Sequence, residues 1–220
     1  MLLNDRQRGY LRDKRILELI TRCRCLNTDQ VQSLIFPGMA SGRRKAQMRL
    51  KRLTEQGRLQ RWRYALDEPF SYYADPDRPI GQMEHTVLLN WMYVWLIQRL
   101  KSWEQLHSFQ YEMDYGILRC DAFAAVRNNV TGTFRFAFLE LDRAESGHKF
   151  RKVQLYNDLY ESDNYADDWW VPLAKRFPPI LMATTTTRQK AKIEKAVEAE
   201  NRNGLEFQVY LVESLRQEVI

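Results

Sequence analysis

Positive charge is concentrated in the first third of the chain. Residues 1–66 contain 16 Lys and Arg against 5 Asp and Glu, whereas residues 67–220 contain 18 against 23. The overall charge of +6 therefore conceals a basic region of +11 followed by an acidic region of −5. This asymmetry predicts two domains, of which the first meets a polyanion.

A stretch rich in Asp, Pro and Gly, residues 75–81, follows the basic third. These residue types interrupt helices and strands, so they indicate a linker. We therefore expect one domain over residues 1–76 and a second over residues 82–220. The chain has 220 residues, 45% of them hydrophobic, which allows both domains to bury a core.

The basic third has the periodicity of three helices and a hairpin. Apolar residues at helical spacing predict helices over residues 5–22, 28–36 and 43–57, the last ending at Gly57. Alternating residues predict strands over 59–64 and 70–74. This order is typical of a winged helix-turn-helix, in which the third helix enters the major groove and the hairpin, or wing, lies along the DNA backbone.

Nine basic residues and one acidic residue lie between Gly38 and Tyr64. Arg61 and Arg63 alternate with aromatic residues, which predicts that one face of the wing strand meets DNA while the aromatic face packs inward. Isolated basic runs are often only solvated surfaces, but this charge in this order of elements favours double-stranded DNA as the partner. The candidate DNA contacts are Arg43, Arg44, Lys45, Gln47, Arg49, Lys51, Arg52, Arg61 and Arg63.

The acidic two-thirds alternates between helical and strand patterns. The order of elements predicts an α+β or α/β domain, in which an antiparallel meander leads through a crossover into a mixed sheet. We expect, in chain order, a helix at 83–101, strands at 109–112, 117–126 and 133–141, a helix at 148–159, a strand at 179–184, a helix at 187–203 and a strand at 206–212.

Three carboxylates fall near strand ends in this second domain. Asp121 begins one expected strand, while Glu140 and Asp142 end the next on a shared face. Carboxylate oxygens bind hard cations such as Mg²⁺, and Lys149 or Lys152 could then stabilise charge on a phosphate, as in a nuclease. Alternatively, these carboxylates end a strand and form surface ion pairs, an interpretation that the spacing alone favours.

Apart from magnesium in such a nuclease, no metal or cofactor is expected. Cys23 and Cys25 have no second pair of cysteines, and the three histidines are scattered without ligand spacing. Three cysteines also make no even disulfide framework, which favours a reducing, cytoplasmic location. The longest apolar-rich stretch, residues 86–100, is too short for a membrane span.

Two surfaces are candidates for protein partners. An acidic segment runs into Trp169-Trp170, which could contact a partner, although tryptophans in such loops more commonly pack beneath them. A homodimer is also plausible because winged-helix regulators commonly read two half-sites as pairs. The apolar helix expected at 83–101 is the candidate surface for such a dimer.

A series of short motifs resembles those of a known family. They are RDKRILELI at 12–20, LNTDQV at 26–31, LIFP at 34–37, RLKRL at 49–53, LRCDA at 118–122, FLELDR at 138–143 and KRFPPIL at 175–181. In this order they resemble the replication-relaxation family of plasmids, phages and conjugative elements, over most of the chain.

The resemblance implies an N-terminal winged helix and a C-terminal domain similar to the PD-(D/E)xK, or restriction-endonuclease-like, fold. By that analogy, Asp121 matches the first acid of the motif and Glu140 the second. Cys120 replaces the proline before the first acid, and Asp142 stands where the lysine is expected. A lysine displaced to the following helix would be needed for catalysis, and without it the fold would serve binding or assembly.

These observations favour a DNA-binding protein of a mobile genetic element rather than an enzyme. It would act as a transcriptional regulator or as an accessory factor of plasmid replication. One alternative is a metal-dependent DNA nuclease that uses Asp121, Glu140 and a displaced lysine. A second alternative is a protein-binding adaptor that uses the Trp169-Trp170 segment.

Overall fold

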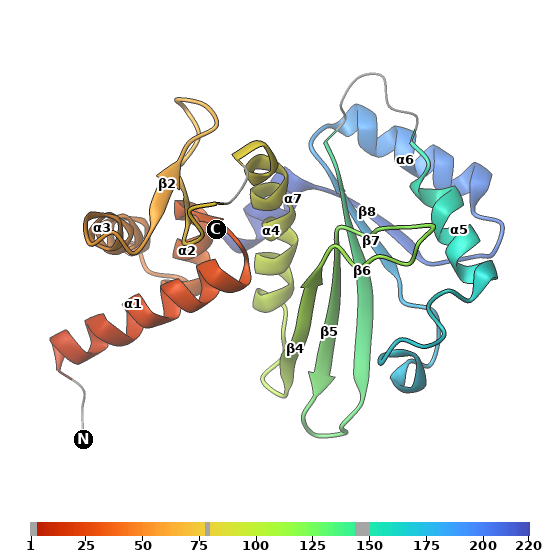
Figure 1. Cartoon of the computed structure of the whole chain (residues 1–220), viewed down its shortest axis with the longest axis horizontal. Coiled ribbons are helices and arrows are strands. Elements are labelled where there is room, and N and C mark those ends of the chain that lie inside the picture. The colour runs from red at the N-terminus through yellow and green to blue at the C-terminus, as the bar shows by residue number, and fades with distance from the viewer. Residues whose placement is uncertain (1–3, 78–79, 144–149) are drawn as a thin grey trace. The chain divides into compact units, whose positions relative to one another are not determined.

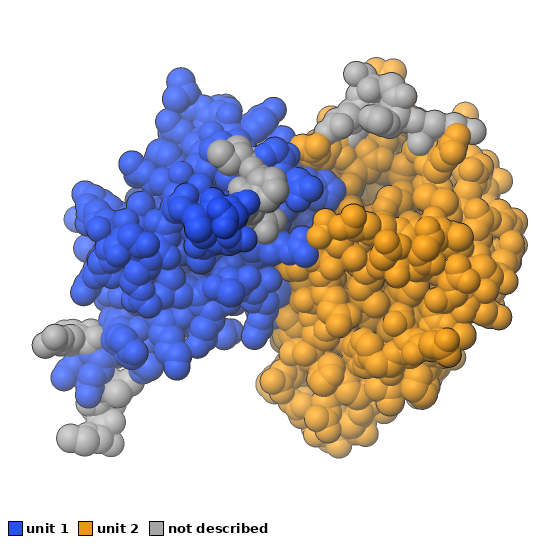
Figure 2. Space-filling model, in the orientation of Figure 1, with its two compact units in different colours: residues 1–98, 216–220 blue, residues 99–215 orange. Residues whose placement is uncertain are grey.

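The computed structural model describes residues 4–77, 80–143 and 150–220. The chain divides into two compact units (Figure 2): unit 1 comprises Met1–Gln98 and Arg216–Ile220, and unit 2 comprises Arg99–Leu215. Helices are combined with a small sheet and a mixed five-stranded sheet, as the sequence pattern predicts (Figure 1). In the described part of the chain, no helix is both long and apolar enough to cross a membrane.

Unit 1 is built from helices and a three-stranded antiparallel sheet in the order β1-β3-β2. Its elements are α1 (Asp5–Arg22), β1 (Leu26–Asn27), α2 (Thr28–Ile35), α3 (Gly42–Glu55), β2 (Gln60–Trp62), β3 (Ser71–Tyr73), the 3₁₀ turn η1 (Ile80–Gln82) and α4 (Met83–Gln98). Asn4 and Asn27 begin α1 and α2 in capping boxes, in which a glutamine three residues later binds the cap amide in return.

The β2–β3 hairpin is shorter than its alternation predicts. The expected strands at 59–64 and 70–74 are limited to three residues each. Trp62 packs inward with Tyr73, as expected. Tyr64, however, is 63% exposed, so the prediction of a wholly inward aromatic face is wrong at this residue. The cause is that β2 ends at Trp62, and the alternation of a strand does not continue beyond it.

Helix α4 belongs to unit 1, although the sequence places the domain boundary before it. Side-chain amides fasten it to the first helices. Asn90 Nδ2 donates to the carbonyl oxygens of Cys23 at 3.0 Å and Cys25 at 2.7 Å. Gln30 Nε2 donates to the carbonyl oxygen of Val87 at 2.7 Å. These contacts give the buried carbonyl groups of Cys23 and Cys25 a donor from α4 and hold the helix against the first part of the chain.

The last helix, α7 (Val212–Val219), returns the chain to unit 1. Gln98 Nε2 donates to the carbonyl oxygen of Val219 at 3.2 Å, and Trp95 Nε1 donates to Glu218 at 2.8 Å. The guanidinium of Arg216 lies 5.3 Å from the ring centroid of Trp91. The sequence analysis does not anticipate this helix, whose final residues complete unit 1.

Unit 2 is organised around a sheet in the order β4-β5-β6-β7-β8. The first three strands form the expected antiparallel meander, and β7 and β8 then add in parallel through helical crossovers. The elements are β4 (Glu104–Tyr111), β5 (Ala122–Asn128), β6 (Phe134–Asp142), α5 (Lys152–Ser162), the 3₁₀ turn η2 (Val171–Leu173), β7 (Ile180–Thr184), α6 (Thr187–Glu200) and β8 (Phe207–Leu211).

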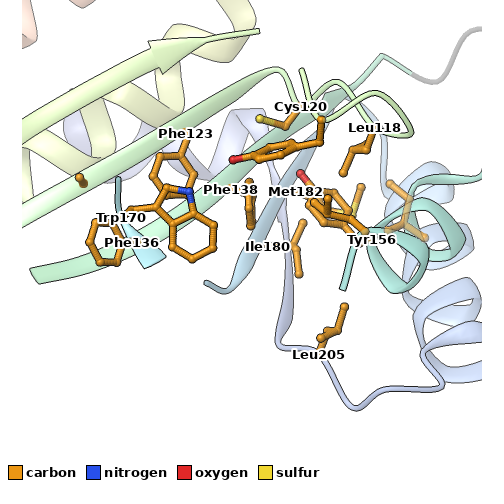
Figure 3. Packing of buried hydrophobic residues seen from close by; sticks show 14 residues of the cluster. Leu118, Cys120, Phe123, Phe136, Phe138, Tyr156, Trp170, Ile180, Met182 and Leu205 are labelled. Atoms are coloured by element: carbon orange, nitrogen blue, oxygen red, sulfur yellow. The ribbon is translucent and has the colours of Figure 1, made fainter. Parts of the chain in front are cut away.

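The main core of unit 2 lies between one face of this sheet and helices α5 and α6 (Figure 1). Figure 3 shows Phe123, Phe136 and Phe138 of neighbouring strands meeting Trp170. Tyr156 of α5 packs on the same cluster, its ring 5.2 Å from that of Phe138. Successive side chains of a strand point to opposite faces of the sheet. Glu140, two residues beyond Phe138 on β6, therefore lies on the same face as the aromatic cluster, beside α5.

The candidate dimer surface on α4 is only partly exposed. Leu89, Trp91 and Val94 are buried, whereas Val87, Leu88 and Trp95 are half-buried. The apolar residues are distributed around the helix and do not form one separate face. The homodimer and its surface therefore stay a prediction.

Replacing Asn90 with leucine tests the role of the amide contacts in unit 1. Asn90→Leu keeps the volume but leaves two buried carbonyl groups without this donor. We expect a loss of about 2–4 kcal/mol in the free energy of unfolding, measured by urea denaturation. Gln56→Ala, which removes an exposed amide, should change it by less than about 0.5 kcal/mol. Equal effects of the two substitutions would contradict this account.

Candidate functional site

The outward face of α3 carries basic and polar side chains. Ala46, Leu50 and Leu53 bury the inner face of the helix. The opposite face exposes Arg44, Gln47, Met48, Lys51 and Arg52. Helical periodicity alone accounts for this separation, because residues three and four apart share one side. Four long basic or polar side chains, together with the apolar Met48, are therefore accessible to a ligand.

Glycine permits α3 to begin close to α2. A side chain on Gly42 would place its Cβ 2.9 Å from the carbonyl oxygen of Phe36, which is closer than real contacts allow. The end of the helix also depends on glycine, since Gly57 has φ of +68°. The two glycines thus set both limits of the basic helix.

Two of the predicted DNA contacts are engaged inside unit 1. Arg49 Nη1 lies 3.3 Å from Asp13 of α1 in a largely buried ion pair, and Arg43 Nε lies 3.0 Å from Asp29 of α2. Arg43 remains exposed, whereas the Arg49 side chain is only 24% exposed. Arg49 therefore attaches α3 to α1, and Arg43 reinforces the contact with α2.

The wing arginines share one aromatic partner. The guanidinium carbons of Arg61 and Arg63 lie 4.6 Å and 4.7 Å from the ring centroid of Phe70. Cation–π contact of this kind holds a charged group in place while leaving its donors available. Phe70 thus positions the two arginines, a role that the sequence analysis does not predict. The place of Phe70 opposite Arg61 and Arg63 in the expected hairpin could have indicated this contact. Lys45 completes the set as a half-buried residue of α3.

In unit 2, the carboxylates expected to converge do so in part. Asp121 precedes β5, and its Oδ2 accepts a hydrogen bond from the backbone amide of Leu141 at 2.7 Å. Glu140 of β6 lies on the face toward α5, since its Oε1 accepts a hydrogen bond from Tyr156 at 2.7 Å. Asp142 instead accepts from Gln189 of α6 at 3.1 Å. Asp121 lies near enough to Glu140 for its charge to raise the pKa of that carboxyl group, so the two belong to one cluster, whereas Asp142 is bound to a different helix.

The lysine of this cluster comes from α5. Lys152 Nζ lies 2.6 Å from Glu140 Oε2 and also donates to the carbonyl oxygen of Arg119 at 3.2 Å. Lys152 and Tyr156 are four residues apart on the helix and both reach Glu140. Lys149, the other candidate, lies outside the described residues. The sequence analysis names Glu140 at a strand end and Lys152 as one of two candidate lysines, and the structure places both beside Tyr156, which that analysis does not name.

Burial determines the proton affinity of the cluster. Glu140 is 1% exposed, and burial followed by the charge of Asp121 raises its pKa to about 8, against the opposing effect of Lys152. For Lys152, burial acts to lower the pKa, but Glu140 and Asp121 outweigh it and the net direction is upward. The site thus favours a positive lysine next to a carboxyl group that titrates near neutrality.

The two carboxylates of the cluster can hold a hard cation only together with other ligands. Within the described residues, no group of three His, Cys, Asp or Glu side chains converges on a point. Magnesium, however, is often held by one or two protein carboxylates together with water and substrate phosphates. Asp121 and Glu140 fit that smaller donor set.

Of the two neighbouring tryptophans, only one is accessible. Trp170 is buried in the core of unit 2, and its indole Nε1 donates to Asp168. Trp169 is 37% exposed and lies beside His107 and Phe136. The proposed partner surface at Trp169-Trp170 is therefore wrong for Trp170, because the aromatic core of the sheet buries it.

Comparisons with known protein families, with curated proteins and with solved structures find no match to this chain.

The pKa of Glu140 predicts a pH-dependent stability. Folded Glu140 holds its proton up to about pH 8, whereas an ordinary glutamate releases it near pH 4.5. Between these values the unfolded state binds fewer protons, so stability falls as pH rises. Glu140→Gln removes this effect and keeps an acceptor for Tyr156.

We expect the free energy of unfolding of Glu140→Gln, relative to the native protein, to increase between about pH 5 and about pH 8. Urea denaturation at the two pH values measures this difference. Glu198→Gln, an exposed substitution on α6, provides the matched control and should show no such trend. A flat difference for Glu140→Gln would contradict the assigned pKa.

Proposed function

We propose that this protein binds double-stranded DNA through α3 and the β2–β3 hairpin of unit 1. The observation that carries the proposal is the division of α3 into an apolar inner face and an exposed face with Arg44, Gln47 and Lys51. An α-helix fits the major groove, where arginine can pair with guanine and glutamine with adenine. The three helices followed by a hairpin support a winged helix-turn-helix.

The hairpin supplies a second point of contact with the backbone. Arg61 and Arg63 are held on Phe70 near the end of β2, so their positive charges are positioned before DNA arrives. Phosphate contacts of this type fix the register of the protein, while α3 reads base edges. Such a protein suits transcription control or plasmid replication in a mobile genetic element, consistent with the resemblance to the replication-relaxation family.

Removing two exposed charges from α3 tests this proposal. Arg44→Ala combined with Lys51→Ala should weaken binding to a fluorescent duplex about tenfold or more at low salt. With six basic contacts, the native protein should show a log–log salt slope of about −5, and the double variant a slope less steep by about 2. Fluorescence anisotropy at several salt concentrations measures both quantities.

Arg188→Ala combined with Lys192→Ala provides the matched control, because both residues are exposed on α6 of unit 2. This pair removes the same charge from the chain and should leave affinity within about twofold. Equal weakening by the two double variants would indicate a general charge effect and would overturn the assignment to α3.

The cluster in unit 2 favours a second candidate function, metal-dependent cleavage of DNA. Here Asp121, Glu140 and Lys152 come together beneath α5. The sequence of an antiparallel meander, a helix and a parallel strand supports a restriction-endonuclease-like fold for unit 2. The lysine would then come from the helix and not from β6.

In this reaction the chain's own residues have separate roles. Lys152 can donate to a phosphate oxygen and so stabilise the charge that develops on it. Asp121 and Glu140 offer oxygen ligands, and Glu140 must first lose its proton, since burial raises its pKa to about 8. Bound magnesium would supply Lewis-acid stabilisation of the phosphoryl oxygens.

Cleavage of plasmid DNA with and without magnesium tests the second function. We expect nicking that requires magnesium and becomes faster as the pH rises toward about 8. Asp121→Asn keeps an acceptor for the Leu141 amide but removes the charge, and it should reduce the rate at least about 100-fold. Asp167→Asn, an exposed control, should retain activity. Absence of magnesium-dependent cutting by the native protein would exclude this function.

A further inference from the structure

Unit 1 contains a cavity of about 260 Å³ between the loop of the β2–β3 hairpin and α4. Three aromatic rings contribute to its walls, from Trp62, Tyr64 and Trp91. The Trp62 and Tyr64 rings lie 6.1 Å apart with an interplanar angle of 58°, so they form two inclined walls. The cavity is separate from the exposed face of α3 and from the cluster in unit 2.

The polar lining of the cavity is predominantly acidic. Asp67 and Glu68 lie in the hairpin loop, and Glu84 lies in the first turn of α4. Among the residues that the structure describes, Arg216 is the one basic residue that lines the cavity. Within the described residues, neither Asp67 nor Glu68 belongs to an ion pair. This acidic lining contrasts with the strongly basic composition of the first 66 residues.

One aromatic wall of the cavity, Trp91, already contacts a positively charged side chain, that of Arg216. Its guanidinium lies 5.3 Å from the ring centroid of Trp91, in a cation–π arrangement. The chain therefore already places one organic cation against this wall. Aromatic faces together with carboxylates are the general means by which proteins bind ammonium groups that carry an apolar body.

We propose that this cavity binds a small organic cation, in which an amine faces the carboxylates and an apolar or aromatic body packs against Trp62 and Tyr64. The volume admits a molecule of about ten heavy atoms. Its positive charge complements the acidic lining, whereas an anion would meet three carboxylates and one guanidinium. The assignment stands independently of DNA binding and of the cluster around Glu140.

Phenethylamine and its neutral analogue phenethyl alcohol distinguish charge recognition from simple apolar binding. Titration of the full chain by calorimetry should give saturable binding of the amine, at least about tenfold tighter than that of the alcohol. The indole NMR signals of Trp62 and Trp91 should shift with the same affinity, which locates the ligand in the cavity. Equal affinity for the two probes, or no saturable response to the amine, would overturn the proposal.

Matched double variants test the carboxylates. Asp67→Asn combined with Glu68→Gln should weaken binding of the amine about tenfold while leaving binding of the alcohol unchanged. Asp75→Asn combined with Asp77→Asn removes the same charge from exposed positions outside the cavity and should change affinity by less than about twofold. All four positions are exposed, so the variants should fold, as circular dichroism can verify. Equal effects of the two pairs would contradict recognition by Asp67 and Glu68.

Discussion

Burial of the Glu140 carboxyl group is the constraint around which unit 2 is arranged. An acid on the covered face of a sheet is costly unless neighbouring groups compensate it. Lys152 and Tyr156 do so from successive turns of α5, and Asp121 is fixed nearby by the amide of Leu141. The contacts that position α5 are therefore also those that define the candidate site. The side chains of Glu140, Lys152 and Tyr156 thus both hold α5 on the sheet and form the candidate site.

Unit 1 uses charge in two different ways. Asp13 and Asp29 are two of the five acidic residues in the first 66, and they engage Arg49 and Arg43. Among the described residues, the other exposed side chains of α3 show no ion pair with α1 or α2. A count of basic residues therefore overstates the number available to DNA, because part of the positive charge holds the helices together.

Local patterns in the sequence predict the helices well. The spacing of apolar residues and the cap at Asn27 lead to α1 and α2, and Gly57 marks the end of α3. Strand limits are less accurate: β4 begins at Glu104 and not at residue 109, because its first half alternates without a strong apolar signal. Helix α7 follows β8 without a Gly or Pro between them, so no local signal separates the two.

The candidate site shows why non-local contacts limit such predictions. Strand ends indicate Asp121 and Glu140, but strand spacing cannot tell that Asp142 pairs with α6 while Glu140 meets α5. Likewise, the bonds of Asn90 to two cysteine carbonyls join segments more than sixty residues apart. The domain limits expected from composition and the compact units of the structure differ for this reason.

The division of unit 1 into Met1–Gln98 and Arg216–Ile220 has a consequence for how the chain folds during synthesis. Unit 2 is continuous in sequence and can form as soon as Leu215 has emerged from the ribosome. Unit 1 gains the contacts of Arg216 with Trp91 and of Val219 with Gln98 only after that. The segment translated first is thus joined by a segment translated more than one hundred residues later, so deletion of residues 216–220 would remove these contacts from unit 1 while leaving the sequence of unit 2 whole.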